Sequence, residues 1–105
     1  MGSVRIVGGR WRGTRLPVPD APGLRPTSDR AREGLFSSLQ VRFGFAGQRV
    51  LDLFAGSGAL GLEAASRGAE EVVLVESNPD AVKVIEYNVG VVGHPKVAVE
   101  PVKAS

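Results

Sequence analysis

The sequence has 105 residues, enough for one small domain, and its 43% hydrophobic and 23% charged residues are typical of a globular protein. It contains no cysteine and one histidine, which excludes a disulfide framework and a zinc site built from these residues. No apolar run approaches the ~18 residues of a membrane-spanning helix, and the N-terminus lacks a signal-peptide core, so we expect a cytoplasmic protein with no membrane partner.

Charge is distributed unevenly along the chain. Residues 1–50 carry nine arginines against three acids, a net charge of +6, whereas residues 51–105 carry a net charge of −4. A basic first half suggests a polyanionic partner. A solvated basic face would give the same pattern, so charge alone does not decide between them.

The first 26 residues form a basic arm in this interpretation. The segments "VRIVGG" (4–9) and "RWRGTRL" (10–16) predict the two strands of a β-hairpin. The segment "PVPDAPGLRP" (17–26) contains four prolines and predicts an extended loop. We therefore expect residues 1–26 to lack a packed core of their own and residues 27–105 to form the main domain.

A helix is expected next, over residues 27–40, with Thr27 as its N-cap. Its expected apolar stripe consists of Ala31, Leu35, Phe36 and Leu39. Residues 41–48 predict a connector anchored by Phe43 and Phe45.

Beyond residue 49 the pattern alternates between strand and helix. The expected elements are a strand at 50–54, a helix at 59–68 closed by Gly68, a strand at 71–76, a helix at 79–90 and a strand at 96–102. This order predicts an α/β fold, the first β-α-β-α-β half of a Rossmann-like, doubly wound sheet. Strand 50–54 would lie at its edge without a second neighbour, which suggests a truncated chain or self-association through that strand.

The stretch "LDLFAGSGALG" (51–61) follows this edge strand with the glycine spacing G-x-G-x-x-G. A strand, a glycine turn and a helix together form an anion-binding site, because Gly56 and Gly58 allow close backbone approach. Glu76 ends the next strand, where an acid accepts hydrogen bonds from ribose hydroxyls. A tight turn and a solvated strand end are the structural alternatives for these residues.

Asp52 bears on the choice of ligand. A carboxylate facing the crevice would repel the diphosphate of a nicotinamide cofactor and attract a sulfonium or an ammonium group. We therefore favour S-adenosyl-L-methionine over NAD. A structural carboxylate that caps the N–H groups of the loop remains an alternative for Asp52.

The stretch "VLDLFAGSGALGLEAASRGAEEVVLVESN" resembles the class I methyltransferase motif of the RsmD-like family, bacterial 16S rRNA (guanine-N(2))-methyltransferases. The segments "VRIVGGRWRGTRLPVP" and "GLRPTSDRAREGLFSSL" are similar to the basic hairpin and first helix of that family. The resemblance covers residues 4–100.

The resemblance implies a set of site residues. Those near the cofactor would be Asp52, Phe54, Ala55, Gly56, Ser57, Gly58, Glu76, Ser77 and Asn78, with Arg25, Thr27 and Asp29 at the pocket edge. Those contacting 16S rRNA, or a small-subunit assembly intermediate, would be Arg5, Arg10, Trp11, Arg12, Arg15 and Arg25. Packing within the hairpin is an equal alternative for Trp11.

Two departures from the family pattern follow. The catalytic (N/D)-P-P-(Y/F) segment of the family is missing from the 105 residues, so no catalytic residue is assigned and these residues alone are expected to be inactive. The third strand offers only Glu100, followed by Pro101, for the adenine amino group. An NAD(P)-binding oxidoreductase domain and a non-catalytic RNA-binding fragment remain alternative functions.

Overall fold

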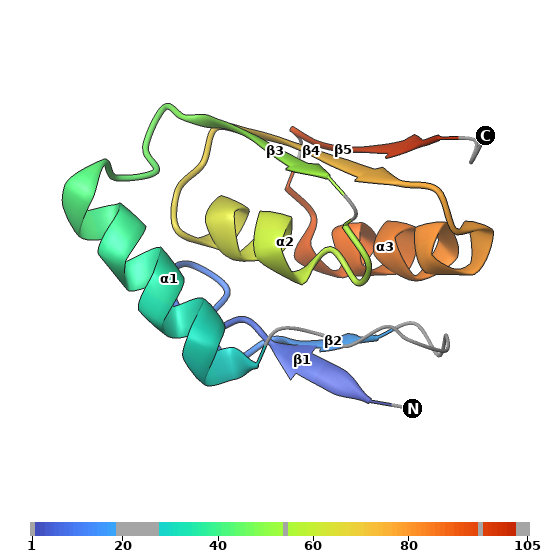
Figure 1. Ribbon diagram of the computed structural model, residues 1–105, viewed down its shortest axis with the longest axis horizontal. Coiled ribbons are helices and arrows are strands. Elements are labelled where there is room, and N and C mark those ends of the chain that lie inside the picture. Colours follow the sequence, from blue (N-terminus) through green and yellow to red (C-terminus); the bar gives the residue numbers. More distant parts are fainter. Residues whose placement is uncertain (1, 19–27, 54, 95, 103–105) are drawn as a thin grey trace.

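The parallel sheet of the protein lies along one side of the molecule in the computed structural model (Figure 1). The structure describes residues 2–18, 28–53, 55–94 and 96–102. The sheet has the order β3-β4-β5, formed by Arg49–Leu53, Glu71–Glu76 and Val97–Pro101. Helices α2 (Ala59–Ser66) and α3 (Pro79–Val92) are its crossovers, so the predicted β-α-β-α-β order and the edge position of the first strand are confirmed.

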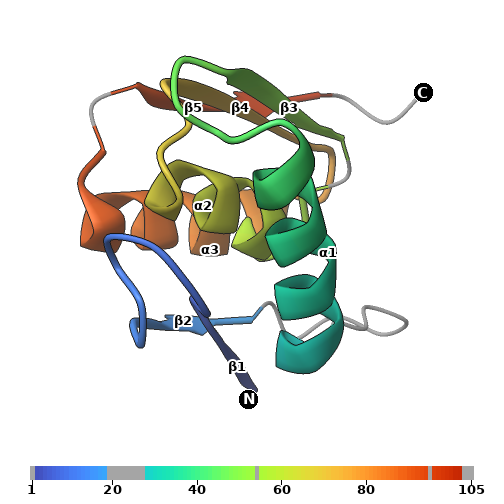
Figure 2. The same ribbon diagram turned by 90° about the vertical axis from the view of Figure 1, so that its left-hand side faces the viewer.

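The N-terminal hairpin packs beneath the helices instead of standing apart (Figures 1 and 2). Strands β1 (Ser3–Arg5) and β2 (Arg15–Pro17) pair antiparallel with Val4 opposite Leu16, which confirms the predicted hairpin with shorter strands. Helix α1 (Asp29–Arg42) flanks the hairpin and α2.

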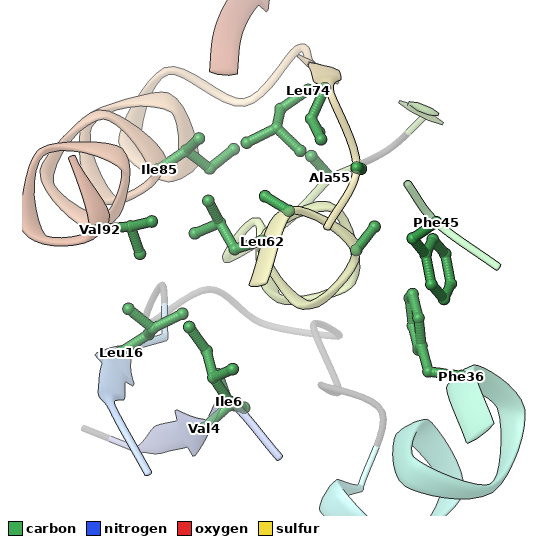
Figure 3. Packing of buried hydrophobic residues seen from close by; sticks show 14 of the residues in the cluster. Val4, Ile6, Leu16, Phe36, Phe45, Ala55, Leu62, Leu74, Ile85 and Val92 are labelled. Atoms are coloured by element: carbon green, nitrogen blue, oxygen red, sulfur yellow. The ribbon is translucent and has the colours of Figure 1, made fainter. Parts of the chain in front are cut away.

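One continuous hydrophobic core joins these layers (Figure 3). Ile6 and Leu16 of the arm, Leu62 of α2 and Ile85 of α3 are each at most 1% exposed. Leu74 of β4 closes the core on the sheet side. Because the arm contributes to this core, its position relative to the sheet is fixed by packing.

The opposite face of the sheet is not covered by the described elements. Both helices lie on one face (Figure 1), and the side chains of β3 alternate between the two faces. Leu51 and Leu53 point to the uncovered face and are 62% and 58% exposed. Among the described strands, β3 pairs only with β4, so its outer backbone edge is unpaired.

Helix α1 differs from the expectation in its boundary and in its buried face. Its N-cap is Ser28, whose hydroxyl accepts from the Ala31 N–H at 3.1 Å, and Thr27 lies outside the described residues. The buried positions are Arg32 and Phe36, whereas Leu35 is 50% exposed. The predicted stripe through Ala31 and Leu35 is therefore wrong. Helix α1 instead buries the face that carries Arg32, because Glu63 of α2 pairs with this arginine.

The connector after α1 follows the prediction in part. Phe45 is buried and stacks on Phe36, with ring centroids 5.5 Å apart, as an anchor should. Phe43 is 72% exposed, so its predicted anchoring role is wrong. In the part of the chain that the structure describes, no helix combines the length and apolar character needed to span a bilayer.

Candidate functional site

The glycine loop occupies the carboxyl edge of the sheet, between β3 and α2. Gly56 and Gly58 have φ of +59° and +82°, a backbone conformation that glycine adopts without a Cβ penalty. The Gly58 N–H donates to the Ala55 carbonyl at 2.7 Å, and the Ala55 N–H donates to Val75 of β4 at 2.9 Å. The loop is therefore a tight turn tied to the neighbouring strand, with Gly58 as the N-cap of α2.

The third glycine of the motif has a packing role. A Cβ at Gly61 would lie 2.2 Å from Leu74 Cδ2 and 3.0 Å from Val72 Cγ1, both on β4. Gly61 thus lets α2 lie directly on the sheet, which sets the position of the loop above the strand ends.

Glu76, the last residue of β4, accepts three backbone hydrogen bonds at this edge. Its Oε1 accepts from the Gly56 N–H at 2.8 Å, and its Oε2 accepts from the N–H groups of Ser77 and Asn78 at 3.0 and 2.9 Å. A carboxylate has about four acceptor positions. The side chain therefore connects the glycine loop to the end of β4 and retains capacity for a further donor.

Asp52 lies beneath the first turn of α2. Its Oδ2 accepts from the Gly61 N–H at 3.2 Å. This contact is of the kind expected if Asp52 is a structural carboxylate that caps backbone N–H groups. Burial raises the pKa of the Asp52 carboxyl above its ordinary value, the nearby Glu76 carboxylate adds to the rise, and the Gly61 N–H opposes it. A half-buried carboxylate with a raised pKa at a strand end is typical of a ligand site.

The remaining residues expected near the cofactor have distinct local roles. The Ser57 hydroxyl accepts from the Ala59 N–H at 3.3 Å, and Asn78 Oδ1 caps α3 by accepting from Asp80 and Ala81. Ser77 is exposed. Phe54 lies outside the described residues, as do Arg25 and Thr27.

A pocket of about 730 Å³ lies beside this edge, between the first turns of α3 and the end of β5. Its lining residues include Ser77, Pro79, Val82, Pro101 and Val102. The walls are mainly apolar, with the exposed polar side chains of Ser77, Lys83 and Glu86 among them, so the pocket suits a flat ring that carries a few polar atoms. Its position places such a ring next to Glu76, at the strand end.

The arginines expected to contact RNA lie on the surface of the arm. Arg10, Arg12 and Arg15 are exposed, and Arg5 pairs with Asp29 at 3.7 Å while remaining about half exposed. Trp11 is half-buried and packs against the hydrophobic core, so the packing role considered for it is present.

Two buried polar residues hold the arm, and their roles were missed by sequence reasoning. Glu63 of α2 is fully buried, accepts from the N–H groups of Val7 and Gly8 at 2.9 Å each, and pairs with Arg32 and Arg67 at 3.3 and 2.9 Å. An acid at a helix position among alanines was the available signal.

Asn88 of α3 is the second of these residues. It is fully buried, and its Nδ2 donates to the Pro17 carbonyl of the arm at 3.0 Å and to the Ser57 carbonyl of the glycine loop at 2.9 Å. One side chain therefore joins the arm, the loop and α3. Its partners were not predictable from the sequence because they lie 71 and 31 residues away.

Comparison with known proteins places this arrangement in a family. The sequence model of the family described as "conserved hypothetical protein 95" matches residues 4–104. Ribosomal RNA small subunit methyltransferase D of Escherichia coli K12 is 60% identical over 75 residues, which are 71% of this chain and 37% of that protein. The protein of the same name from Haemophilus influenzae is 45% identical over 87 residues, 83% of this chain and 44% of that protein.

The solved structures agree with the sequence matches. The E. coli protein yhhF superposes with a TM-score of 0.85 at 45% sequence identity, covering 98% of this chain and 55% of that one. The fold is thus that of a class I methyltransferase, represented by the first half of its sheet. The chain spans roughly two fifths to just over half of the length of the relatives that it matches.

Proposed function

The chain belongs to the family described as "conserved hypothetical protein 95", and from this premise we propose that it carries the S-adenosyl-L-methionine half-site and RNA arm of a methyltransferase for 16S rRNA. The modified group would be the exocyclic amine of a guanine. The protein would act in the cytoplasm, on 16S rRNA or a small-subunit assembly intermediate. The single observation that supports the proposal is that Asp52, the glycine loop and Glu76 lie together at one edge of the sheet, connected by hydrogen bonds.

The residues at this edge suit the parts of S-adenosyl-L-methionine. The glycine loop, with positive φ at Gly56 and Gly58, gives a ligand access to backbone without a Cβ in the way. Glu76 has acceptor capacity left for ribose hydroxyls, and the apolar pocket next to it suits the adenine. Asp52 supplies negative charge where the methionine ammonium or sulfonium would lie.

The same contacts argue against a dinucleotide. A pyrophosphate needs the first-turn N–H groups of the helix after the loop. Here the Gly61 N–H is taken by the Asp52 carboxylate, whose charge would repel a diphosphate.

The cofactor, when bound, supplies an electrophilic methyl group. The chain's own residues would bind and orient it: the glycine loop would offer backbone donors, Glu76 would hold the ribose end and Asp52 would hold the cationic end. Alignment of the acceptor nitrogen with the methyl carbon would supply most of the rate. An unpaired or flipped guanine is needed for that alignment.

Replacing Asp52 by asparagine should change the cofactor affinity and the free energy of unfolding in opposite directions. Because the folded-state pKa is raised above the ordinary 3.8, the ionised carboxylate lowers stability at neutral pH, and this cost disappears below 3.8, where the group is protonated in both states. We therefore expect Asp52→Asn to raise the free energy of unfolding at neutral pH, with no gain in acid. Loss of a charged contact, worth ~1.5–3 kcal/mol, should weaken cofactor binding about 10- to 100-fold.

Urea unfolding at neutral pH and below pH 3.8 measures the change in the free energy of unfolding. Calorimetric titration with S-adenosyl-L-methionine measures the change in cofactor affinity. Asp80→Asn, at the exposed start of α3, is the matched control and should leave the cofactor affinity unchanged. Wild-type protein that binds NADH but not S-adenosyl-L-methionine would refute the proposed function.

The arm gives a prediction of its own. Arg12 and Arg15 are exposed and should displace counterions from RNA phosphates. Replacing both by glutamine should reduce the slope of log affinity against log salt by about 1.5, at ~0.7–0.9 per phosphate contact. Arg30 and Arg42, exposed on α1, are the matched control pair. The affinity of each double variant for an rRNA fragment is measured by filter binding at several salt concentrations. Equal salt slopes for the two double variants would show that the arginines of the arm form a solvated basic face and do not contact RNA.

A further inference from the structure

A second groove lies at the amino edge of the sheet, the edge opposite the glycine loop. It has a volume of about 700 Å³ and is bordered by the arm tip, the end of α2 and the connection from α3 to β5. Figure 2 looks onto this edge and shows the arm loop beside the end of α3. Its charged and polar lining residues include Arg10, Ser66, Arg67, Glu70, His94 and Lys96.

The wall formed by the arm is held in place before any ligand binds. The Arg10 N–H donates to the Ser66 carbonyl at 2.7 Å, and the Trp11 N–H donates to Ser66 Oγ at 2.9 Å. Ser66 Oγ in turn donates to the Gly8 carbonyl at 2.7 Å. A Cβ at Gly9 would lie 2.1 Å from the Ser66 carbonyl oxygen, so the backbones are in direct contact. Pre-ordering of this kind lowers the entropic cost of binding.

The opposite wall is ordered by a ring contact and a local hydrogen bond. The Lys96 N–H donates to His94 Nδ1 at 3.0 Å, so the neutral imidazole carries its proton on Nε2. The His94 ring meets the Trp11 ring edge-on, with centroids 5.8 Å apart. The Arg10 guanidinium also lies over the Trp11 ring, 5.9 Å from its centroid. These contacts connect the two walls through Trp11.

Two cations at this groove are available to an anion. Arg10 is exposed and forms no ion pair with the described residues. Among the residues that the structure describes, Lys96 pairs with Glu70 alone, at 3.7 Å, and both side chains are more than half exposed, so this pair is weak. Arg67, in contrast, is held by the buried Glu63 at 2.9 Å. The groove therefore offers Arg10 and Lys96, together with the His94 donor, to a group of the phosphodiester type.

We propose that the groove between Arg10 and Lys96 is a second contact site for RNA backbone, separate from the site of methyl transfer. The inference rests on the proposed function, because the exposed arginines of the same arm make RNA the favoured polyanion. Helix α2, of eight residues, separates the two edges by ~12 Å at 1.5 Å per residue. An RNA that reaches both must present its target guanine and a second backbone segment at that separation.

Trp11 is the single tryptophan of the sequence and contacts Arg10 and His94 of the groove, so its fluorescence reports on these two lining residues. The probe is a stem–loop RNA with single-stranded flanks, and binding is followed in parallel by the anisotropy of a label on the RNA. We expect the Trp11 emission to change over the same RNA concentrations as the anisotropy. Lys96→Ala should weaken binding severalfold and reduce the salt slope by about 1.

Arg30→Ala is the matched control, since Arg30 is exposed on α1 outside the groove and its replacement removes the same charge. Equal effects of Lys96→Ala and Arg30→Ala, or RNA binding without a change in Trp11 emission, would overturn the inference and leave the proposed function standing. Pyrophosphate that changes the emission as strongly as the RNA would overturn it in favour of a simple anion site. Failure to bind both RNA and S-adenosyl-L-methionine would refute the proposed function as well.

Discussion

Replacing Glu63 by alanine is expected to lower the free energy of unfolding by ~3–5 kcal/mol, the cost of removing one partner from a buried ion pair. Glu63 is fully buried, and Arg32 and Arg67 beside it are 1% and 6% exposed. The change would leave two guanidinium groups and the N–H groups of Val7 and Gly8 without this acceptor. The arm should therefore detach from α2 before or during unfolding.

Glu70→Ala is the matched control for this variant. Glu70 pairs with Lys96 at the surface, where an ion pair contributes ~0–1 kcal/mol. Urea unfolding of both variants, followed by circular dichroism, gives the two free energies. Equal losses of stability would show that the buried cluster contributes no more than an exposed pair.

The sheet and the glycine loop were predictable because their signals are local. Apolar runs such as "EVVLVE" identify buried parallel strands, and β4 spans these residues as predicted. Gly56, Gly58 and Glu76 follow strand ends directly, and the structure brings them together through the bond from the Gly56 N–H to Glu76. Parallel strands bring their carboxyl ends to one edge, so sequence order alone placed these residues.

The arm docking was not predictable, for the opposite reason. A helical pattern assigns Leu35 to the buried face of α1, whereas the structure buries Arg32 because Glu63, 31 residues away, neutralises it. Asn88 lies on the buried face of α3 for a comparable reason, since its amide satisfies two carbonyls from distant segments. The hydrophobic pattern of a helix depends on its apolar residues alone, so it does not predict polar groups that are buried together with a partner.

The 105 residues produced alone are expected to bind S-adenosyl-L-methionine without methylating rRNA. Their sequence contains no Asn-Pro-Pro or Asp-Pro-Pro segment, which the family resemblance implies for the group that receives the base. The proposed cofactor half-site, formed by Asp52, the glycine loop and Glu76, would supply only the cofactor side of the reaction. A tritium-methyl transfer assay on small-subunit rRNA, run beside a calorimetric cofactor titration, measures both properties. Detectable transfer would show that the base is received by residues to which we assign no such role.

The same 105 residues are expected to self-associate through β3. The outer backbone edge of this strand is unpaired among the described strands, and Leu51 and Leu53 add exposed apolar surface on the uncovered face. An unpaired apolar edge is a template for pairing with another chain, and a charged side chain on it opposes that pairing. Light scattering should therefore give a mass above that of the monomer, and Leu51→Lys should return the protein toward the monomer. Glu71→Lys, on the interior strand β4, is the control that adds positive charge away from this edge. If the wild-type chain stays monomeric at high concentration, the unpaired edge of β3 does not drive self-association and the prediction is wrong.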